Sequence, residues 1–401
     1  MAAESHLHLE RLLARRASFL PRYEKLGCDQ SGAISFLGGL VDSYSFPINA
    51  FIGVAQRVMQ QEGREALQYA DPLGDLGLRE LLVRQAKVEE GLRLAPENVV
   101  ITHGNLAALG MICLAFLEPG DLVVVESPTN VEALRLFRLY EVELVAAPLD
   151  DQGVRVNALA QILVRLKLDG RKPKILYTMP TFHDPTGLTM TSERRQALIR
   201  LAHEFGFLVV EDDTYRDLRY EGEKIPSLFA TDRSGFVLKT GTYSKILAPG
   251  LRLGWILGPA EIIAHLAQVR IDGGAPHYVA RLVAEYAREG LLERHVADLI
   301  RIYRNKRDTL LAALAEFCPS DLEWSRPAGG FFVWMDLPAT IDPLQLFAAA
   351  QSEGVVYLPG EYCFADGTVD SHIRLSFSHL SSAEITEGIK RLGRAMRKAS
   401  R

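Results

Sequence analysis

The stretch GTYSKILAPGLRLG at residues 241–254 is the most informative part of this chain. It places the amine of Lys245 next to a serine hydroxyl and ahead of an arginine. Upstream, residues 206–215 read GFLVVEDDTY, so an apolar run leads to Asp212 and then to Tyr215. Such a run is typical of a buried strand, and ligands of α/β proteins bind at the carboxyl ends of these strands. We therefore expect these side chains to form one site.

A strand-end carboxylate, a tyrosine hydroxyl, an amine and an arginine, in this order along the chain, suit pyridoxal phosphate. This cofactor needs an amine for a Schiff base, an anion at its ring nitrogen, and cations or hydroxyls at its phosphate. Asp212 alone is equally compatible with capping the next segment, but with Tyr215 and Lys245 it favours a cofactor site. The competing lysine, Lys239, lies in the strand before the turn, where a surface or sheet-edge position is expected. We therefore favour Lys245.

Strand-like and helix-like stretches alternate over the middle of the chain. We expect strands over residues 99–102, 122–126, 144–147, 175–178, 207–211, 236–239 and 253–257. Continuous Val, Ile and Leu runs separated by helices indicate an α/β fold in which a mostly parallel sheet of seven strands lies between helices.

The C-terminal part predicts a second, smaller α/β unit. The segment 292–317 is long and amphipathic enough to form a linking helix. Strands are expected at residues 331–334, 354–357 and 372–377. We expect an N-terminal arm covering the active site over residues 1–50, a large cofactor-binding domain over 51–290 and a small C-terminal domain over 291–401.

The composition excludes several classes of protein. The chain has 401 residues, of which 48% are hydrophobic, and a formal net charge of −5, so neither a nucleic acid nor an anionic membrane surface is an expected partner. Its four cysteines (Cys28, Cys113, Cys318 and Cys363) are scattered, which argues against a metal site or a disulfide framework. The N-terminus lacks the apolar core of a signal peptide, so we expect a soluble, cytoplasmic protein.

The chain resembles the fold type I pyridoxal phosphate enzymes, specifically the class I/II aminotransferases, in the branch with 2-aminoadipate and kynurenine aminotransferases. The resemblance runs from Ile34 to Arg374. Residues 241–254 are its most specific motif, followed by Asp212-x-x-Tyr215 and the Pro-Thr-Gly of residues 185–187. It implies transfer of the amino group of an L-amino acid to a 2-oxo acid.

The resemblance also implies a role for each matching residue. Lys245 would be the catalytic Schiff-base lysine, Asp212 would bind the ring nitrogen and Tyr215 the ring O3′. The residues expected around the phosphate are Gly104, Asn105, Thr242, Ser244 and Arg252. The turn THGN at residues 102–105 supports this independently, because its glycine and the following helix N-terminus suit an anion.

Four further residues concern the substrate and a second subunit. Arg374 would bind the substrate α-carboxylate, for which a bidentate guanidinium is well suited. Gly39 would let the backbone pass close to the substrate, and Tyr44 is a candidate for the substrate pocket. Tyr69 matches a tyrosine that reaches the phosphate of the neighbouring subunit, which implies a homodimer with shared active sites.

Two positions in the cofactor site depart from the family pattern. Asp184 stands where an asparagine normally donates to the cofactor O3′, and an ionised carboxylate cannot donate. Asn130 stands where an aromatic ring normally stacks on the cofactor, so it either opens space there or hydrogen-bonds a substrate.

These departures keep other functions open. Related enzymes perform β- or γ-elimination, replacement, cyclisation, C–C bond formation or oxidation on the same scaffold. Some regulators carry a similar domain behind a DNA-binding module, but only about 30 residues precede the match here, fewer than such a domain needs. A binding protein without catalysis is disfavoured by the presence of Lys245, Asp212 and Tyr215.

Overall fold

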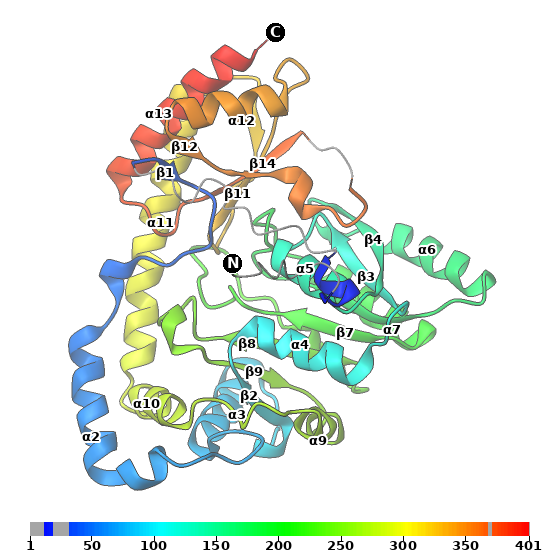
Figure 1. Ribbon diagram of the computed structural model, residues 1–401, viewed down its shortest axis with the longest axis vertical. Helices are drawn as coiled ribbons and strands as arrows, with labels where there is room; N and C mark the ends of the chain where they lie inside the picture. Colours follow the sequence, from blue (N-terminus) through cyan, green and yellow to red (C-terminus); the bar gives the residue numbers. More distant parts are fainter. Residues whose placement is uncertain (1–11, 19–31, 368–370, 401) are drawn as a thin grey trace, which may run out of the picture.

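The computed structural model describes residues 12–18, 32–367 and 371–400. It contains a large sheet covered by helices and a second, smaller layered unit, and the long helix α11 (Leu291–Phe317) runs between them (Figure 1). In the described ranges, no helix is both long and apolar enough to cross a membrane. Cys28 lies outside the described residues.

The large sheet has the strand order β2-β9-β8-β7-β6-β3-β4-β5. The strands are β2 (Val99–Thr102), β3 (Leu122–Ser127), β4 (Glu143–Asp150), β5 (Gly153–Val154), β6 (Pro173–Thr178), β7 (Leu208–Asp212), β8 (Val237–Thr242) and β9 (Gly254–Leu257). The neighbouring pairs β4–β3, β3–β6, β6–β7 and β7–β8 are parallel. Strand β9 is antiparallel to both of its neighbours, β2 and β8. All seven expected strands are present. The expected number was one too low, because the two-residue β5 folds back antiparallel on β4.

Alternating side chains of the central strands enter two separate cores. Val123 and Val125 of β3 pack in one hydrophobic cluster, whereas Val124 between them packs in the other. Tyr177 and Leu176 of β6 divide in the same way. Side chains on a strand point to opposite faces in turn, so a sheet with helices on both faces needs apolar residues at every position.

Helices cover both faces of the large sheet (Figure 1). They are α3 (Leu76–Glu90), α4 (Asn105–Phe116), α5 (Val131–Leu139), α6 (Val156–Leu168), α7 (Ser192–Phe205), α8 (Leu228–Thr231), α9 (Ala260–Gln268) and α10 (His277–Arg288). The N-terminus of α7 is capped by Thr191, whose side chain accepts a hydrogen bond from the Arg194 N–H.

The second unit is built on a four-stranded sheet of order β10-β11-β14-β13. Its strands are β10 (Glu323–Trp324), β11 (Phe332–Asp336), β13 (Leu358–Pro359) and β14 (His372–Ser376), while β12 (Val355–Val356) pairs in parallel with β1 (Ile34–Ser35). Helix α13 (Ser382–Ala399) packs against both α11 and α12 (Pro343–Ser352), α12 also contacts β12, and α2 (Ile48–Ala66) packs against α10. Shorter elements are α1 (Arg15–Ser18), η2 (Ser43–Ser45), η3 (Pro96–Asn98), η4 (Pro249–Leu251) and η5 (Gly360–Cys363).

Gly254 lets three segments meet closely at the carboxyl end of β8. It pairs with Thr102 of β2 on one side and with Thr242 of β8 on the other. A Cβ atom at this position would lie 2.6 Å from the carbonyl carbon of Gly104 and 2.8 Å from the carbonyl oxygen of Gly241. These neighbours are backbone atoms, so they cannot turn aside as a flexible side chain would.

We expect Gly254→Ala to lower the free energy of unfolding by ~1–3 kcal/mol, because the added methyl group must push strands apart. Gly250→Ala is the matched control, since that glycine is exposed and has no atom within 4 Å of the added Cβ. Denaturant unfolding of both variants measures the difference. Equal losses in the two variants would contradict the proposed close approach.

Candidate active site

The predicted site residues converge where strands of both sheets end. Asp212 is the last residue of β7, and Lys245 lies in the turn that follows β8. Gly104 caps the N-terminus of α4, and Arg374 projects from β14 of the second sheet. Because β7 and β8 are parallel neighbours, their carboxyl ends lie together at one edge of the sheet.

The amine of Lys245 is held among backbone and aromatic groups. Its Nζ donates to the Gly39 carbonyl oxygen at 2.7 Å and lies 5.9 Å from the ring centres of Tyr215 and Phe331. Burial lowers the pKa of Lys245 to about 8, even though Asp184 and Asp212 favour the charged form. Half of such amines are neutral near pH 8, and a neutral amine is a nucleophile and a base.

The Asp212 carboxylate is buried and surrounded by hydrogen-bond donors. Its Oδ2 accepts from Asn105 Nδ2 at 2.7 Å and from the Tyr177 hydroxyl at 2.8 Å. Its Oδ1 accepts from the Thr214 backbone N–H and hydroxyl. Burial raises the pKa of Asp212, and these hydrogen bonds oppose that shift.

Two of these donors differ from the sequence-based hypothesis. The sequence predicts Asn105 at the phosphate; its side chain donates to Asp212, and its backbone lies at the start of α4, where an anion could be bound. Tyr177 was not identified as a site residue. Its position within the apolar run of β6 suggests a core residue. A buried tyrosine hydroxyl usually needs a hydrogen-bond partner, and this need was the available sign of a nearby polar group.

A cluster of donors lies around Gly104. This glycine has a φ of 92°, and a Cβ on it would lie 3.0 Å from Nη2 of Arg252. The same Nη2 donates to the His103 carbonyl oxygen at 3.1 Å, while the Ser244 N–H donates to the Thr242 hydroxyl oxygen at 3.1 Å. The Arg252 guanidinium thus lies beside Gly104 at the N-terminus of α4, and the Thr242 and Ser244 hydroxyls lie at the carboxyl end of β8. Groups of these kinds favour an anion.

Tyr215 and Gly39 lie on the side of the site nearer the second sheet. The Tyr215 ring is buried edge-to-face against Phe331 and Phe332. Burial raises the pKa of its hydroxyl well above the ordinary value, and the charges of Asp184 and Asp212 add to this. A Cβ on Gly39 would lie 3.3 Å from the Tyr215 hydroxyl and 3.5 Å from Lys245 Nζ, so glycine allows this approach.

Arg374 lies in the site but is already paired. Its Nη1 donates to Asp184 Oδ1 at 2.7 Å, and its Nη2 donates to the Leu37 carbonyl oxygen at 2.6 Å. The guanidinium carbon stacks 4.2 Å from the centre of the Phe332 ring. Asn130 joins this group, because its Nδ2 donates to Asp184 Oδ2 at 2.7 Å while its Oδ1 caps α5. Asn130 therefore holds Asp184 as well as shaping the site.

Two predicted residues lie on the surface of this chain. The Tyr44 side chain is 99% exposed in η2, so a role in substrate binding would need a second surface against it. Tyr69 is 83% exposed, beside Gly273, whereas Asp212 is buried and Lys245 is half-buried. The structure of one chain leaves the roles of both tyrosines as predictions.

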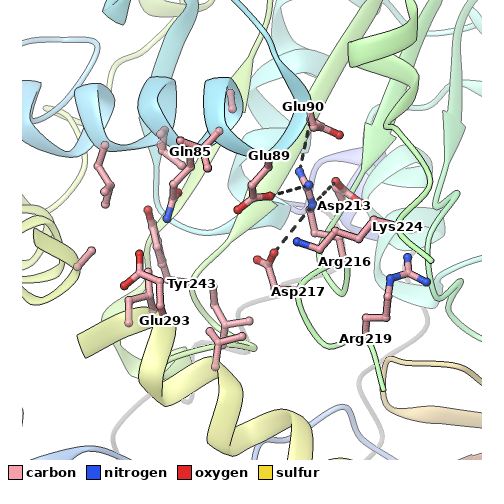
Figure 2. A pocket seen from close by; sticks show the side chains of 18 of the residues that line it. Gln85, Glu89, Glu90, Asp213, Arg216, Asp217, Arg219, Lys224, Tyr243 and Glu293 are labelled. Atoms are coloured by element: carbon pink, nitrogen blue, oxygen red, sulfur yellow. Dashed lines mark hydrogen bonds and ion pairs between the residues drawn. The ribbon is translucent and has the colours of Figure 1, made fainter. Parts of the chain in front are cut away.

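The competing lysine lies at a pocket of about 810 Å³ whose lining also includes Thr242 of the proposed phosphate site. Lys239 lines it, and Lys239 Nζ lies 3.0 Å from a carboxylate oxygen of Glu90 and from one of Asp213. Figure 2 shows these two carboxylates converging with Arg216 on the pocket wall. Burial disfavours the charged form of Lys239, but Asp213 and Glu90 outweigh it and raise its pKa. Lys239 is thus buried and paired with carboxylates, rather than exposed at the surface. Lys245 is not among the described residues that line this pocket.

Comparisons with known proteins agree with this geometry. A family model described as aminotransferase class I and II matches residues 41–392. The aromatic-amino-acid aminotransferase 1 of Thermococcus litoralis is 38% identical, over 97% of this chain and 93% of the relative. The 2-aminoadipate transaminase of Thermus thermophilus is 36% identical, over 91% of this chain and 90% of the relative. The solved kynurenine aminotransferase of Pyrococcus horikoshii, in complex with PMP, superimposes with a TM-score of 0.93 at 37% identity, covering 98% of each chain.

The residues present fit pyridoxal phosphate. The donor set combines a weakly basic amine, a buried carboxylate, and a cradle of guanidinium, hydroxyls and helix N-terminus at Gly104. Asn105 Oδ1 and Arg374 Nε are buried without a hydrogen-bond partner, so polar capacity is left for a ligand. Lys245, Asp212 and the group around Gly104 would hold the aldehyde, the ring nitrogen and the phosphate respectively.

In the cofactor-free protein, we expect the Lys245 amine to titrate near pH 8 rather than at its ordinary value of 10.5, because burial disfavours the ammonium form. Competitive acetylation across the neutral to alkaline range, with mass spectrometry of the peptide that contains Lys245, measures the midpoint. The same peptide in the urea-unfolded chain is the control. Identical midpoints in the folded and unfolded chains would contradict the expected shift.

The same shift predicts how stability depends on pH. Between about pH 8 and 10.5 the unfolded chain binds a proton at Lys245 that the folded chain has lost. The contribution of Lys245 to the free energy of unfolding therefore rises with pH in this window. Lys245→Met should lack this rise, which parallel denaturation of the two cofactor-free proteins at both ends of the window would reveal.

Proposed function

Because this chain belongs to the class I and II aminotransferases, we propose that Lys245 is the residue through which it moves an amino group from an L-amino acid to a 2-oxo acid. The observation that carries this assignment is a desolvated amine, with a pKa of about 8, next to the buried Asp212 carboxylate and the Arg374 guanidinium. Among the lysines of the region, Lys239 is engaged by two carboxylates and is unsuited to the task.

Each side chain has a separate task in this reaction. Pyridoxal phosphate, when bound, supplies an aldehyde that condenses with amines and a ring that withdraws electrons from the substrate Cα. Asp212 would stabilise positive charge at the ring nitrogen, and the Tyr215 hydroxyl would donate toward the ring oxygen. Lys245 Nζ, when neutral, accepts the proton from the substrate Cα and releases it again as a general acid. Arg374 orients the substrate through its carboxylate.

The substrate class follows from Arg374 and from the relatives. A buried guanidinium against the Phe332 ring suits a substrate with an α-carboxylate and an adjoining apolar portion. The relatives are named for aromatic amino acids, 2-aminoadipate and kynurenine. We propose that the donor is an L-α-amino acid from this range, with aromatic donors as the first to test.

A second function is favoured by one specific observation. Asp184 and Asn130 are bonded to each other where the family pattern has an asparagine and an aromatic ring. Loss of a stacking ring changes the space above the cofactor, and this is the kind of change by which the same scaffold supports elimination, replacement, cyclisation, C–C bond formation or oxidation.

We also propose a homodimer with shared sites and a division into two domains. The exposed positions of Tyr44 and Tyr69 support a second chain packing against this face. The proposed large domain, 51–290, contains the whole eight-stranded sheet, and the proposed small domain, 291–401, contains the four-stranded sheet. Residues 1–50 would cover the active site, which agrees with the hydrogen bond from Lys245 to Gly39.

With bound pyridoxal phosphate and no oxo acid, we expect the protein to convert an L-amino acid to its 2-oxo acid only in an amount equal to the cofactor. Turnover should continue when a 2-oxo acid is added, because the amino group then has an acceptor. Lys245→Ala should lower kcat by ~10²–10⁴-fold through loss of the base. Mass spectrometry of both oxo acids measures these results.

Lys87→Ala, at an exposed position on α3, is the control for this experiment and should retain the wild-type rate. Continued turnover with release of ammonia and no acceptor would contradict amino-group transfer and support elimination or deamination.

Mixing two inactive variants tests the shared site. If Tyr69 acts in the neighbouring subunit, a heterodimer of Lys245→Ala and Tyr69→Ala chains has one site with both defects and one intact site. Activity should therefore return when the two variants are unfolded and refolded together. If Tyr69 acts within its own chain, each site keeps one defect and no activity returns. Each variant refolded alone is the control.

A further inference from the structure

Near Lys245, the Asp184 carboxylate accepts hydrogen bonds from two side chains, Arg374 and Asn130. Asp184, in the loop after β6, accepts from Arg374 Nη1 through one oxygen and from Asn130 Nδ2 through the other, each at 2.7 Å. Asp184 is 2% exposed and Arg374 is 7% exposed. The guanidinium also donates to the Leu37 carbonyl, so two separate acceptors hold it in the free protein.

This pairing conflicts with the role assigned to Arg374. A substrate carboxylate that binds Arg374 brings a second negative charge to a guanidinium that already neutralises Asp184. Two carboxylates that share one buried site cannot both remain ionised at low cost. Either the two anions repel each other or one of them becomes neutral.

The other charged groups nearby do not remove this conflict. The charged or titratable groups around Asp184, Arg374 and Lys245 are Asp212, Tyr177, Tyr215, Glu126, Arg252, Cys363 and His183. His183 precedes Asp184 in the chain, and its Nε2 lies 3.2 Å from a carboxylate oxygen of Glu126, so it faces that carboxylate. Arg252 lies at the Gly104 cluster, where a phosphate would engage it. Asp212 and Glu126 add negative charge to this region. The Lys245 amine would be consumed by bonding to the cofactor.

We propose that Asp184 occupies Arg374 in the substrate-free enzyme and takes up one proton when a substrate carboxylate binds there. A neutral Asp184 keeps its hydrogen bond from Asn130 and gains an O–H donor, which is the capacity that the asparagine of the family pattern would have supplied. This inference rests on the proposed function of Arg374. Asp184 is thereby a positioning and specificity-determining residue, and carboxylate binding weakens as pH rises because binding consumes a proton.

Calorimetry on the pyridoxal phosphate-loaded enzyme tests this proposal without turnover. The probe is 3-phenylpropionate, which has a carboxylate but no amino group, and 3-phenylpropanamide is its uncharged match. Binding heats measured at one pH in buffers of different ionisation enthalpy give the number of protons taken up. On binding 3-phenylpropionate, the wild type should take up about one proton more than Asp184→Asn. On binding 3-phenylpropanamide, the two proteins should take up the same number of protons.

The pH dependence gives a second measurement. Between neutral pH and pH 9, the wild-type affinity for 3-phenylpropionate should fall by up to ~10-fold per pH unit more steeply than that of Asp184→Asn. The variant should bind the acid more tightly than the wild type at the alkaline end, whereas an impaired fold would weaken binding. Cofactor absorbance and thermal unfolding check that the variant is folded.

Three results would overturn the proposal, and they are distinguishable from one another. No proton uptake by the wild type excludes it without reference to any variant. Equal proton uptake by the wild type and Asp184→Asn assigns the proton to another group. Binding of the amide but not of the acid by both proteins removes the carboxylate-binding role of Arg374, and the proposed function of that residue falls together with the inference.

Discussion

Burial of the Asp212 carboxylate is the constraint on which the rest of the site depends. An ionised carboxylate inside a protein is costly unless donors replace the water that it loses. Three side chains supply these donors: Asn105 at the start of α4, Tyr177 in β6, and Thr214, which lies two residues after Asp212. The same carboxylate favours the charged form of Lys245, against the stronger effect of burial. Asp212 therefore moderates the effect of burial on Lys245, and a ligand that supplies positive charge to Asp212 would offset the cost of its own burial.

The sheet order explains how these groups meet. Parallel pairing of β6, β7 and β8 brings their carboxyl ends to one edge, and the antiparallel β9 returns the chain so that Arg252 reaches Gly104. Arg374 comes from a different sheet and is held in place by the Leu37 carbonyl and by Asp184. The proposed substrate-binding residue therefore comes from the second sheet and meets a loop of the large sheet, whereas Asp212, Lys245 and Gly104 all belong to the large sheet and its loops.

Sequence patterns predicted the parts of this site that depend on local order along the chain. Strand ends fix the positions of Asp212 and Lys245, and a glycine before a helix fixes Gly104, because each is coded within a few neighbouring residues. The pairing of Asp184 with Arg374 joins residues 190 positions apart, and each residue alone suggests a different partner. Tyr177 was missed because a tyrosine within an apolar strand is compatible with the core as well as with the site. The short β5 was missed because two residues carry no periodic signal.

Lys239 and Lys245 show how one protein distinguishes between two enclosed amines that are close in sequence. Two carboxylates keep the first amine protonated, and a protonated amine has no lone pair with which to attack an aldehyde. The second amine has lost much of its hydration without gaining a comparable counter-ion, so it is the more reactive of the two near neutral pH. The difference in reactivity between these two lysines therefore comes from the carboxylates that pair with Lys239 but not with Lys245. A reagent directed at amines would be expected to discriminate between them in the same sense as the natural aldehyde.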